Sequence, residues 1–425
     1  MKNLLFFSML FVILLPNADY AQYAPRLLAL TDASLIDANN PTPLTHQTML
    51  ISAGKILAIF STGSRPLPDS AVVIALKGKF LLPGLIDSHV HMATDPSVTD
   101  NRTHTLDVLQ RMLYSGITTV RDMAGDARTL AGLARDAKLG DIPSPDIYYS
   151  ALMAGPVFFS DPRTATSTQG DAPGKTPYML AVTDTTNLTL AIARAKGCGA
   201  TGIKLYANLS AGLVSKIVAE ANKQGMIVWG HAWLQDAIPS DLVNAGVSSI
   251  SHAALVVHET VGNIPSSWKK APHDAKFWDD SIPDLTRLFN LMKTHHTILD
   301  ATLLTYKQWG ERDPSMRWDY EISKRIAARA YKAGVTICAG TDDDQEEFVQ
   351  SEMRLLVSDA GFTPIDAIIA ATRNSAAALH LEQTRGTLSP GKIADLLVLD
   401  KNPLENIDNI KSVFLVVKDG RVYQK

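Results

Sequence analysis

The sequence predicts an α/β protein in which a closed (β/α)8 barrel, the TIM barrel, is joined to a small β-sandwich domain. Three observations predict this fold class. Short apolar runs alternate with helical segments through the middle of the chain, β-prone runs with tight turns occupy both ends, and 425 residues are enough for one large barrel plus one smaller domain. The barrel is therefore expected to be inserted between two halves of the smaller domain.

Eight short apolar segments are the predicted barrel strands. They are Leu85–Met92, Thr118–Met123, Asp146–Met153, Gly202–Ala207, Ile227–Ala232, Ser249–Ala253, Thr297–Leu303 and Thr336–Thr341. The segments between them, such as Leu213–Gln224 and Ile322–Ala333, carry the apolar period of helices. An open doubly wound sheet is the alternative, but no glycine-rich phosphate loop follows the first strand. The pattern therefore favours the barrel.

Both ends of the chain contain hairpin signals. Near the N-terminus, Ala53-Gly54 separates two β-prone runs, and near the C-terminus Asp419-Gly420 does the same. A further strand is predicted at Ile393–Leu399. Neither end is long enough to bury a core alone, so we expect them to pack together as one domain. The predicted parts are residues 22–82 and 385–425 for that domain and 83–384 for the barrel.

The first residues have the layout of a secretory signal peptide. Lys2 precedes an apolar run from Leu4 to Leu15, and small residues follow at Ala18 and Ala21. The run is too short to span a bilayer as a helix. Residues 1–21 are therefore predicted to be a signal peptide, with no stable membrane anchor, and the mature protein is predicted to be periplasmic or secreted.

Charge and composition bear on the class of partner. A net charge of −3 and a pI near 6.4 give no electrostatic basis for binding nucleic acid. The expected partner is a small-molecule or dipeptide substrate, and a homo-oligomer is compatible with the sequence. The two cysteines, Cys198 and Cys338, lie in or beside predicted strands and are expected to be free thiols.

Potential metal ligands recur at the ends of the predicted barrel strands. His89 and His91 lie two apart on the first strand, so both side chains point the same way. His231 ends the fifth strand, His252 the sixth and Asp342 the eighth. The carboxyl ends of barrel strands converge on one pocket, where these side chains are expected to meet. A single His-x-His pair is a weak signal, and the recurrence strengthens it.

Lys204 lies in the fourth predicted strand between apolar neighbours. Burial lowers the pKa of a lysine, and a neutral amine can react with carbon dioxide to form a carbamate that bridges two cations. A salt bridge to a barrel aspartate such as Asp122 is the alternative. The residues alone leave both interpretations open.

Together these residues resemble the amidohydrolase superfamily. The resemblance rests on Pro83-Gly-Leu-Ile-Asp-Ser-His-Val-His91, Lys204, His231, His252, Ala339-Gly-Thr-Asp342, Ala371-Thr-Arg-Asn-Ser-Ala-Ala377 and Gly386–Leu399. The last two segments resemble the imidazolonepropionase-like and Xaa-Pro or Xaa-Arg dipeptidase-like branch. The similarity covers essentially the whole mature chain, and the order of its ligand positions is highly specific.

The resemblance implies a centre of two divalent metal ions, usually zinc. His89 and His91 would hold one ion and His231 and His252 the other, with carboxylated Lys204 as the bridging ligand and Asp342 on the first ion. Metal-activated water would attack the scissile carbonyl, and Asp342 would be the catalytic residue that moves the proton.

Three residues are candidates for substrate binding. Some dipeptidase-like relatives place a tyrosine where this chain has Trp233, and Tyr206, two residues after Lys204, is a candidate substitute. Arg121 is expected either to bind a substrate carboxylate or to form a structural ion pair. The loops at Ala154–Tyr178 and Ala254–Pro283 follow strand ends, so they are expected to wall the pocket.

The function expected from the sequence is an exported metal-dependent amidohydrolase that cleaves an amide or peptide bond of a dipeptide or N-acyl amino acid. A lactonase or a cyclic-amide hydrolase of the imidazolonepropionase type is an alternative that uses the same water. A non-catalytic binding protein that retains the barrel is an alternative of another class. The presence of every expected ligand argues against the last.

Overall fold

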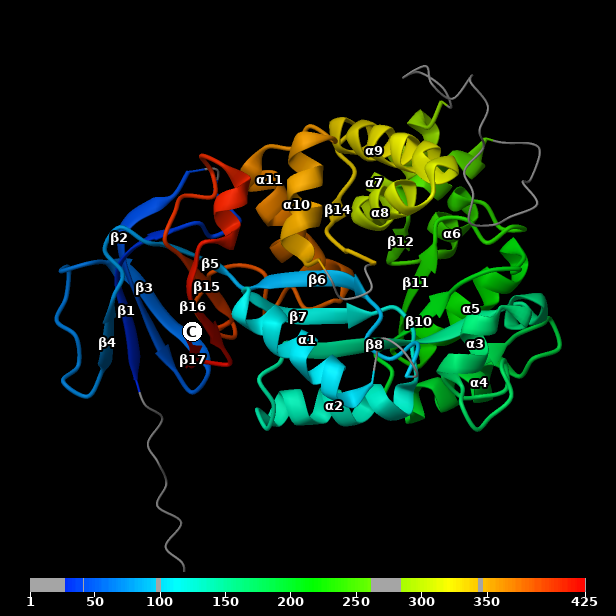
Figure 1. The fold of residues 1–425 in the computed structure, drawn as a ribbon, viewed down its shortest axis with the longest axis horizontal. Helices are drawn as coiled ribbons and strands as arrows, with labels where there is room; N and C mark the ends of the chain where they lie inside the picture. The colour runs from blue at the N-terminus through cyan, green and yellow to red at the C-terminus, as the bar shows by residue number, and fades with distance from the viewer. Residues whose placement is uncertain (1–26, 41, 97–100, 261–283, 343–346, 425) are drawn as a thin grey trace, which may run out of the picture.

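A computed structural model describes residues 27–40, 42–96, 101–260, 284–342 and 347–424. The predicted signal peptide lies outside these residues. The chain forms two bodies, a sheet built from both ends and a larger barrel built from the middle (Figure 1). No helix within the described ranges is long and apolar enough to cross a membrane.

The barrel contains all eight predicted strands, which confirms the predicted fold class. In hydrogen-bonded order they are β6 (Leu85–Val90), β7 (Ile117–Asp122), β8 (Asp146–Ala154), β10 (Gly202–Leu205), β11 (Ile227–His231), β12 (Ser249–Ser251), β13 (Ile298–Asp300) and β14 (Ile337–Cys338). Neighbouring strands are parallel, and a short strand β9 (Met179–Ala181) is added beside β8. The amide of Ser88 donates to the carbonyl of Ala339 at 2.9 Å, which brings the last strand back to the first.

Helices surround the barrel strands. They are α1 (Arg102–Tyr114), α2 (Ala127–Leu139), α4 (Leu188–Gly197), α5 (Ala211–Lys223), α6 (Pro239–Ala245), α7 (Thr286–His295), α9 (Arg317–Lys332), α10 (Val349–Ser358), α11 (Pro364–Ile369) and α12 (Ser375–Ala378). In α5, Leu213, Val214, Ile217 and Val218 are buried, which is the spacing of one helix face. Thr363 caps α11 by accepting a hydrogen bond from the amide of Asp366.

Further short elements follow strand ends or connect helices. They are the 3-10 turns η1 (Pro156–Ser160), η2 (Ala253–Glu259), η4 (Pro314–Met316) and η6 (Ile407–Lys411), the helices α3 (Pro162–Ser167) and α8 (Leu303–Arg312), and the π-helical turn η5 (Ala370–Asn374). Leu255 of η2 and Met316 of η4 line the main pocket, and most of its other side chains from these elements come from η1, α3 and α8. They follow β8 and β13, so they lie at the carboxyl ends of strands, where barrels build their sites.

The two ends of the chain form one mainly antiparallel sheet, as predicted. Its strands are β1 (Leu28–Leu35), β2 (Leu44–Ser52), β3 (Lys55–Ser61), β4 (Val72–Ala75), β5 (Phe80–Pro83), β15 (Leu396–Leu399), β16 (Val413–Lys418) and β17 (Arg421–Tyr423). The N-terminal and C-terminal segments join where β5 pairs with β15. Both hairpin turns have positive φ, 48° and 74° at Ala53-Gly54 and 48° and 75° at Asp419-Gly420.

A buried cluster of charges joins the sheet to the barrel. Arg385 forms ion pairs with Asp146 of β8 and with Asp395 just before β15. Lys418 of β16 lies 2.7 Å from the same Asp146 carboxylate. All four side chains are almost completely buried. None of these four residues is among those that line the main pocket. Cys198 and Cys338 are free thiols, as predicted.

Candidate active site

A pocket of about 510 Å³ opens at the carboxyl ends of the barrel strands. Five predicted ligands line it, and we call them the ligand cluster: His89, His91, His231, His252 and Asp342. They come from β6, from the end of β11 and from the residues that follow β12 and β14. The barrel therefore brings together side chains that are as far as 253 residues apart in the sequence.

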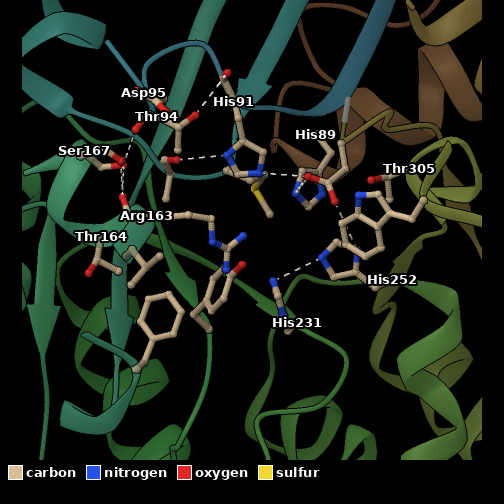
Figure 2. A pocket seen from close by; sticks show the side chains of 18 of the residues that line it. His89, His91, Thr94, Asp95, Arg163, Thr164, Ser167, His231, His252 and Thr305 are labelled. Atoms are coloured by element: carbon tan, nitrogen blue, oxygen red, sulfur yellow. Dashed lines mark hydrogen bonds and ion pairs between the residues drawn. The ribbon is translucent and has the colours of Figure 1, made fainter. Parts of the chain in front are cut away.

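The nitrogen and oxygen atoms of the ligand cluster lie close enough to share cations. Asp342 Oδ1 is 3.0 Å from His91 Nε2 and 3.5 Å from His89 Nε2. On the other side, His252 Nε2 is 3.2 Å from His231 Nε2 (Figure 2). His89, His252 and Asp342 each offer one atom within 4.8 Å of the others, a grouping that could hold a metal ion.

Two members of the cluster have a positive φ, a backbone conformation that residues other than glycine rarely adopt. φ is 77° at His252 and 49° at Asp342. Each such residue costs about 1–3 kcal/mol, so the surroundings have to hold it in place. The amide of Asp342 donates to the carbonyl of His89 at 2.8 Å, and the amide of His252 donates to that of Asp300 at 2.9 Å. These backbone hydrogen bonds to neighbouring strands help to hold His252 and Asp342 in their strained conformations.

Burial sets the charge state of the cluster. It lowers the pKa of His252 to about 3 and that of His231 well below its usual value, so both rings are neutral at pH 7. Burial alone would raise the pKa of Asp342, but His89, His91 and His252 around it hold that pKa below its usual range. Neutral imidazoles beside an ionised carboxylate are the protonation states that bind metals.

Lys204 lies within the barrel and is completely buried. Its Nζ atom is 3.2 Å from Ser251 Oγ, and burial lowers its pKa to about 7. The alternative ion pair with Asp122 is absent from the described residues, because the Asp122 carboxylate accepts instead from the amides of Met92 and Ala124, at 2.5 and 3.1 Å. A substantial neutral fraction of Lys204 near pH 7 makes carboxylation chemically accessible, and the carbamate itself stays a prediction.

Asp300, which the sequence did not identify as a site residue, contacts the Nδ1 atom of the His89 ring. Its Oδ2 atom is 2.7 Å from His89 Nδ1 and accepts a hydrogen bond from Ser251 Oγ at 3.0 Å. The side chain of Asp300 is completely buried at the end of β13. With Nδ1–H donating to this carboxylate, the lone pair of His89 Nε2 faces the pocket. In the sequence, the one indication of this role is that Asp300 is an acidic residue at the end of an apolar strand.

Arg121 is not a substrate residue, because it is completely buried and does not line the pocket. Its Nε donates to the carbonyl of Ser88 at 2.5 Å, one terminal nitrogen donates to Ser249 Oγ at 2.9 Å, and the other lies 3.3 Å from Asp300. The structural ion pair, which the sequence left as an equal alternative, is therefore the correct interpretation. Arg121 neutralises the carboxylate that supports His89.

Trp233 is not among the described residues that line the pocket, so its predicted substrate contact stays a prediction. The turn after β11 directs its indole onto His258, with ring centroids 3.7 Å apart. Its Nε1 donates to the carbonyl of Gln235 at 3.1 Å, and the residue is only 2% exposed. The Trp233 side chain is packed against His258, and the aromatic residues that line the pocket come from other segments.

Tyr206 does line the pocket, as predicted. Its ring centroid is 4.0 Å from that of His231 and 4.5 Å from that of Phe158 in η1. Burial raises the pKa of Tyr206 to about 12, so its hydroxyl remains protonated at neutral pH and can donate. Arg163 of α3 forms a hydrogen bond with it.

The loop after β8 walls the pocket, as expected from its length, whereas 261–283 in the other long loop lies outside the described residues.

Histidine and aspartate side chains gather at the carboxyl ends of the strands of this (β/α)8 barrel. This arrangement is typical of barrel hydrolases in which such side chains can bind metal ions. A sequence model described as the amidohydrolase family matches residues 80–423. The chain belongs to the amidohydrolase family. This confirms the family predicted from the sequence.

Comparison with individual proteins points to the same branch. The chain is 26% identical over 476 aligned residues to an ochratoxinase from Aspergillus niger, covering 95% of this chain and 90% of the relative. A segment of 121 residues is 44% identical to an imidazolonepropionase from Pyrobaculum arsenaticum and covers 28% of this chain and 27% of the relative. The fold is similar to that of a Xaa-Pro dipeptidase with bound methionine, with a TM-score of 0.75, 22% identity and coverage of 94% of this chain and 100% of the other.

Proposed function

We propose that this protein is an exported, binuclear metal-dependent hydrolase that cleaves the amide or peptide bond of a dipeptide or N-acyl amino acid. The observation that carries the proposal is the ligand cluster together with Lys204. Four imidazoles and one carboxylate meet in one pocket, and a completely buried lysine with a lowered pKa lies in the strand between β8 and β11. A structural role for so many partly desolvated polar groups would be costly.

The residues present fit a pair of divalent cations. His89, His91 and Asp342 would hold one ion, and His231 and His252 the other, with carboxylated Lys204 between them. Imidazole and carboxylate ligands favour zinc. The short contact between the nitrogens of His231 and His252 also fits a shared cation, because two neutral imidazoles can form only one weak hydrogen bond with each other. Bound cations would supply a polarised carbonyl and a water of lowered pKa.

The chain's own residues perform the remaining tasks. The carboxylate of Asp342 is ionised and lines the pocket beside His89 and His91, so it is placed to accept the proton from the attacking water and later pass it to the leaving amine. Asp300 fixes the ring of His89 through the contact with its Nδ1 atom. In the overall reaction one carbon–nitrogen bond breaks, one carbon–oxygen bond forms, and the amine leaves with a proton.

The named relatives agree with a carbon–nitrogen substrate. The similarity to an ochratoxinase spans nearly the whole of both chains. A cyclic-amide hydrolase is the second candidate, because the local match to an imidazolonepropionase has the higher identity. A lactonase would use the same groups, and a non-catalytic binding protein would have no need of a complete ligand cluster.

A substrate panel tests this proposal. Purified protein is assayed against dipeptides, N-acyl amino acids, imidazolonepropionate and lactones, with zinc supplied. We expect hydrolysis of dipeptides or N-acyl amino acids. Activity confined to lactones, or to the cyclic amide, would show that the proposed substrate class is wrong.

Export is a separate part of the proposal. It is supported by the apolar run from Leu4 to Leu15 behind Lys2 and by the small residues up to Ala21. Expression of the full chain in a bacterial host followed by fractionation and mass spectrometry tests it. A mature protein that begins at residue 22 in the periplasm or medium is expected, and an intact Met1 in the cytoplasm would contradict export. Native mass spectrometry of the same sample gives the oligomeric state.

A further inference from the structure

The loop after β8 places a fixed positive charge in the pocket. Arg163 lies in the first turn of α3 and lines the pocket beside Phe158 and Thr164. Asp161 caps this helix and pairs with the guanidinium through both of its oxygens, with Nε–Oδ1 at 3.0 Å and a terminal nitrogen to Oδ2 at 2.8 Å. Because the paired edge is held in this way, the orientation of the guanidinium is set by the local helix start.

A second copy of this local motif shows what is special about Arg163. Arg128 pairs in the same manner with Asp126, which caps α2, with Nε–Oδ1 at 2.9 Å and a terminal nitrogen to Oδ2 at 2.7 Å. The side chains of the two arginines are almost equally exposed, 49% for Arg128 and 50% for Arg163. The Asp-x-Arg pairing itself is therefore a common local structure and does not indicate a site.

The difference between the two arginines lies in what surrounds them. Arg128 does not line the pocket, whereas Arg163 does and forms a hydrogen bond with Tyr206. Tyr206 is in turn in ring contact with His231 of the ligand cluster. Tyr206 therefore lies between the guanidinium and the ligand cluster and is in contact with both.

The opposite wall of the pocket is aromatic. Tyr306 and Trp309 of α8 line it, with ring centroids 5.4 Å apart, and Tyr306 is 6.1 Å from the ring of His252. In Figure 2, Arg163 and Thr305, the latter on α8, lie on opposite sides of His231. A substrate that spans the cluster would have an anionic group at one end and an apolar group at the other.

We propose that Arg163, oriented by Asp161 and Tyr206, binds the free carboxylate of the residue on the leaving side of the scissile bond. The inference rests on the proposed function and narrows it. Substrates are then dipeptides or N-acyl amino acids with a free carboxylate one residue from the bond, and their carboxamides are poor substrates. The aromatic wall of α8 receives an apolar side chain on the acyl side.

The physical basis is the geometry and charge of the guanidinium. Arginine presents a planar fork of donors that suits a carboxylate, and Tyr206, which lines the pocket beside Arg163, offers a hydroxyl as a further hydrogen-bonding group. Asp161 reduces the net charge of the pair, so a carboxylate is recognised by directed hydrogen bonds more than by long-range attraction. A neutral carboxamide would place an NH2 group against these donors, which leaves one side of the contact unsatisfied.

The test compares two probes, L-phenylalanyl-L-alanine and L-phenylalanyl-L-alanine amide. The variants are Arg163→Gln, Arg163→Lys and, as the matched control, Arg128→Gln. Loss of a hydrogen bond to a charged group predicts a decrease in kcat/KM of about 10- to 100-fold for the acid in Arg163→Gln, mainly through KM. The value for the amide should fall much less than the value for the acid, so that the acid-to-amide ratio decreases, and Arg163→Lys should lie in between because it keeps the charge and loses the fork.

The outcomes separate the inference from the proposed function. Wild-type protein that prefers the acid, with a preference abolished in Arg163→Gln and retained in Arg128→Gln, supports the carboxylate subsite. If wild-type protein hydrolyses acid and amide equally, or if the preference survives in Arg163→Gln, the inference is wrong while the hydrolase stands. If neither probe nor any other dipeptide or N-acyl amino acid is hydrolysed, the proposed function fails. The ratio of the two probes is insensitive to partial unfolding, because unfolding lowers both activities together.

Discussion

The carboxylate of Asp300 lies 2.7 Å from Nδ1 of His89, and both side chains are almost completely buried. The contact joins β13 to β6 across 211 positions of sequence and decides which nitrogen of His89 faces the pocket. Asp300 is therefore a positioning residue for the ligand cluster. Arg121 stabilises its charge from the other side.

We expect Asp300→Asn to weaken metal binding by about 10- to 100-fold, because the amide no longer fixes the protonation state of His89. Titration of metal-free protein with zinc against a competing chelator measures the change. Ser249→Ala is the control, since it removes a hydrogen bond of Arg121 and leaves the contact between His89 and Asp300 intact. Equal zinc affinity in Asp300→Asn and wild type would show that the contact is only structural.

Gly340 is required because a side chain there would collide with the same pair of residues. An added Cβ would lie 2.5 Å from Asp300 Oδ1 and 2.6 Å from the Cβ of His89. Gly340→Ala should lower the free energy of unfolding by about 1–3 kcal/mol and weaken zinc binding. Gly132→Ala is the matched control, since nothing lies within 4 Å of the added Cβ in α2, and it should stabilise by about 0.5–1 kcal/mol. Chemical denaturation measures both, and a Gly340→Ala protein as stable as wild type would contradict the crowding.

The sequence predicted the parts of the site that depend on strand ends. His231 and Asp342 could be placed because an alternating βα pattern fixes where each strand ends, and a barrel brings those ends together. Lys204 could be recognised as buried because its strand neighbours are apolar. The eight strands and the joining of the two ends follow from the same local patterns.

The parts that sequence reasoning missed depend on contacts between distant segments. Asp300 acquires its role only when β13 lies close to β6, and Arg163 acquires its role only when α3 folds back over Tyr206. The surroundings of Trp233 and Arg121 have the same origin. The turn after β11 directs Trp233 onto His258, and the interior of the barrel takes the side chain of Arg121, neither of which a strand pattern specifies.

The wall that carries Tyr306 and Trp309 depends on a buried acid. The Glu352 carboxylate accepts hydrogen bonds from the amides of Leu303 and Leu304, at 3.0 and 2.8 Å, at the start of α8. Burial raises the pKa of Glu352 from 4.5 to about 8. Between these two values the folded protein binds a proton that the unfolded chain releases, so this group's contribution to stability is present at low pH and is lost as pH rises towards 8.

Glu352→Gln should remove that dependence, because its amide is uncharged at every pH. We expect the variant to gain about 1–4 kcal/mol in unfolding free energy relative to wild type on going from pH 5 to pH 8. Urea denaturation of the metal-free proteins at several pH values measures the difference. A difference that is constant with pH would contradict the raised pKa.

If Lys204 carries the proposed carbamate, Lys204→Ala should lose both bound metal and activity, because the group that would bridge the two ions is removed. Lys204→Met controls for the cavity, since it keeps most of the buried volume without an amine. We expect the same loss in both variants, with Lys204→Met retaining more of the stability to heat. Full metal content and activity in either variant would show that the carbamate bridge is wrong.

The metal content of the wild-type protein tests the central claim most directly. The full chain is purified without chelators from medium supplemented with zinc, and metal and protein are quantified in the same sample by elemental mass spectrometry and amino-acid analysis. The arrangement of His89, His91, His231, His252 and Asp342 around buried Lys204 predicts about two divalent ions per chain. A ratio below one ion per chain, in protein that is folded, would contradict the account.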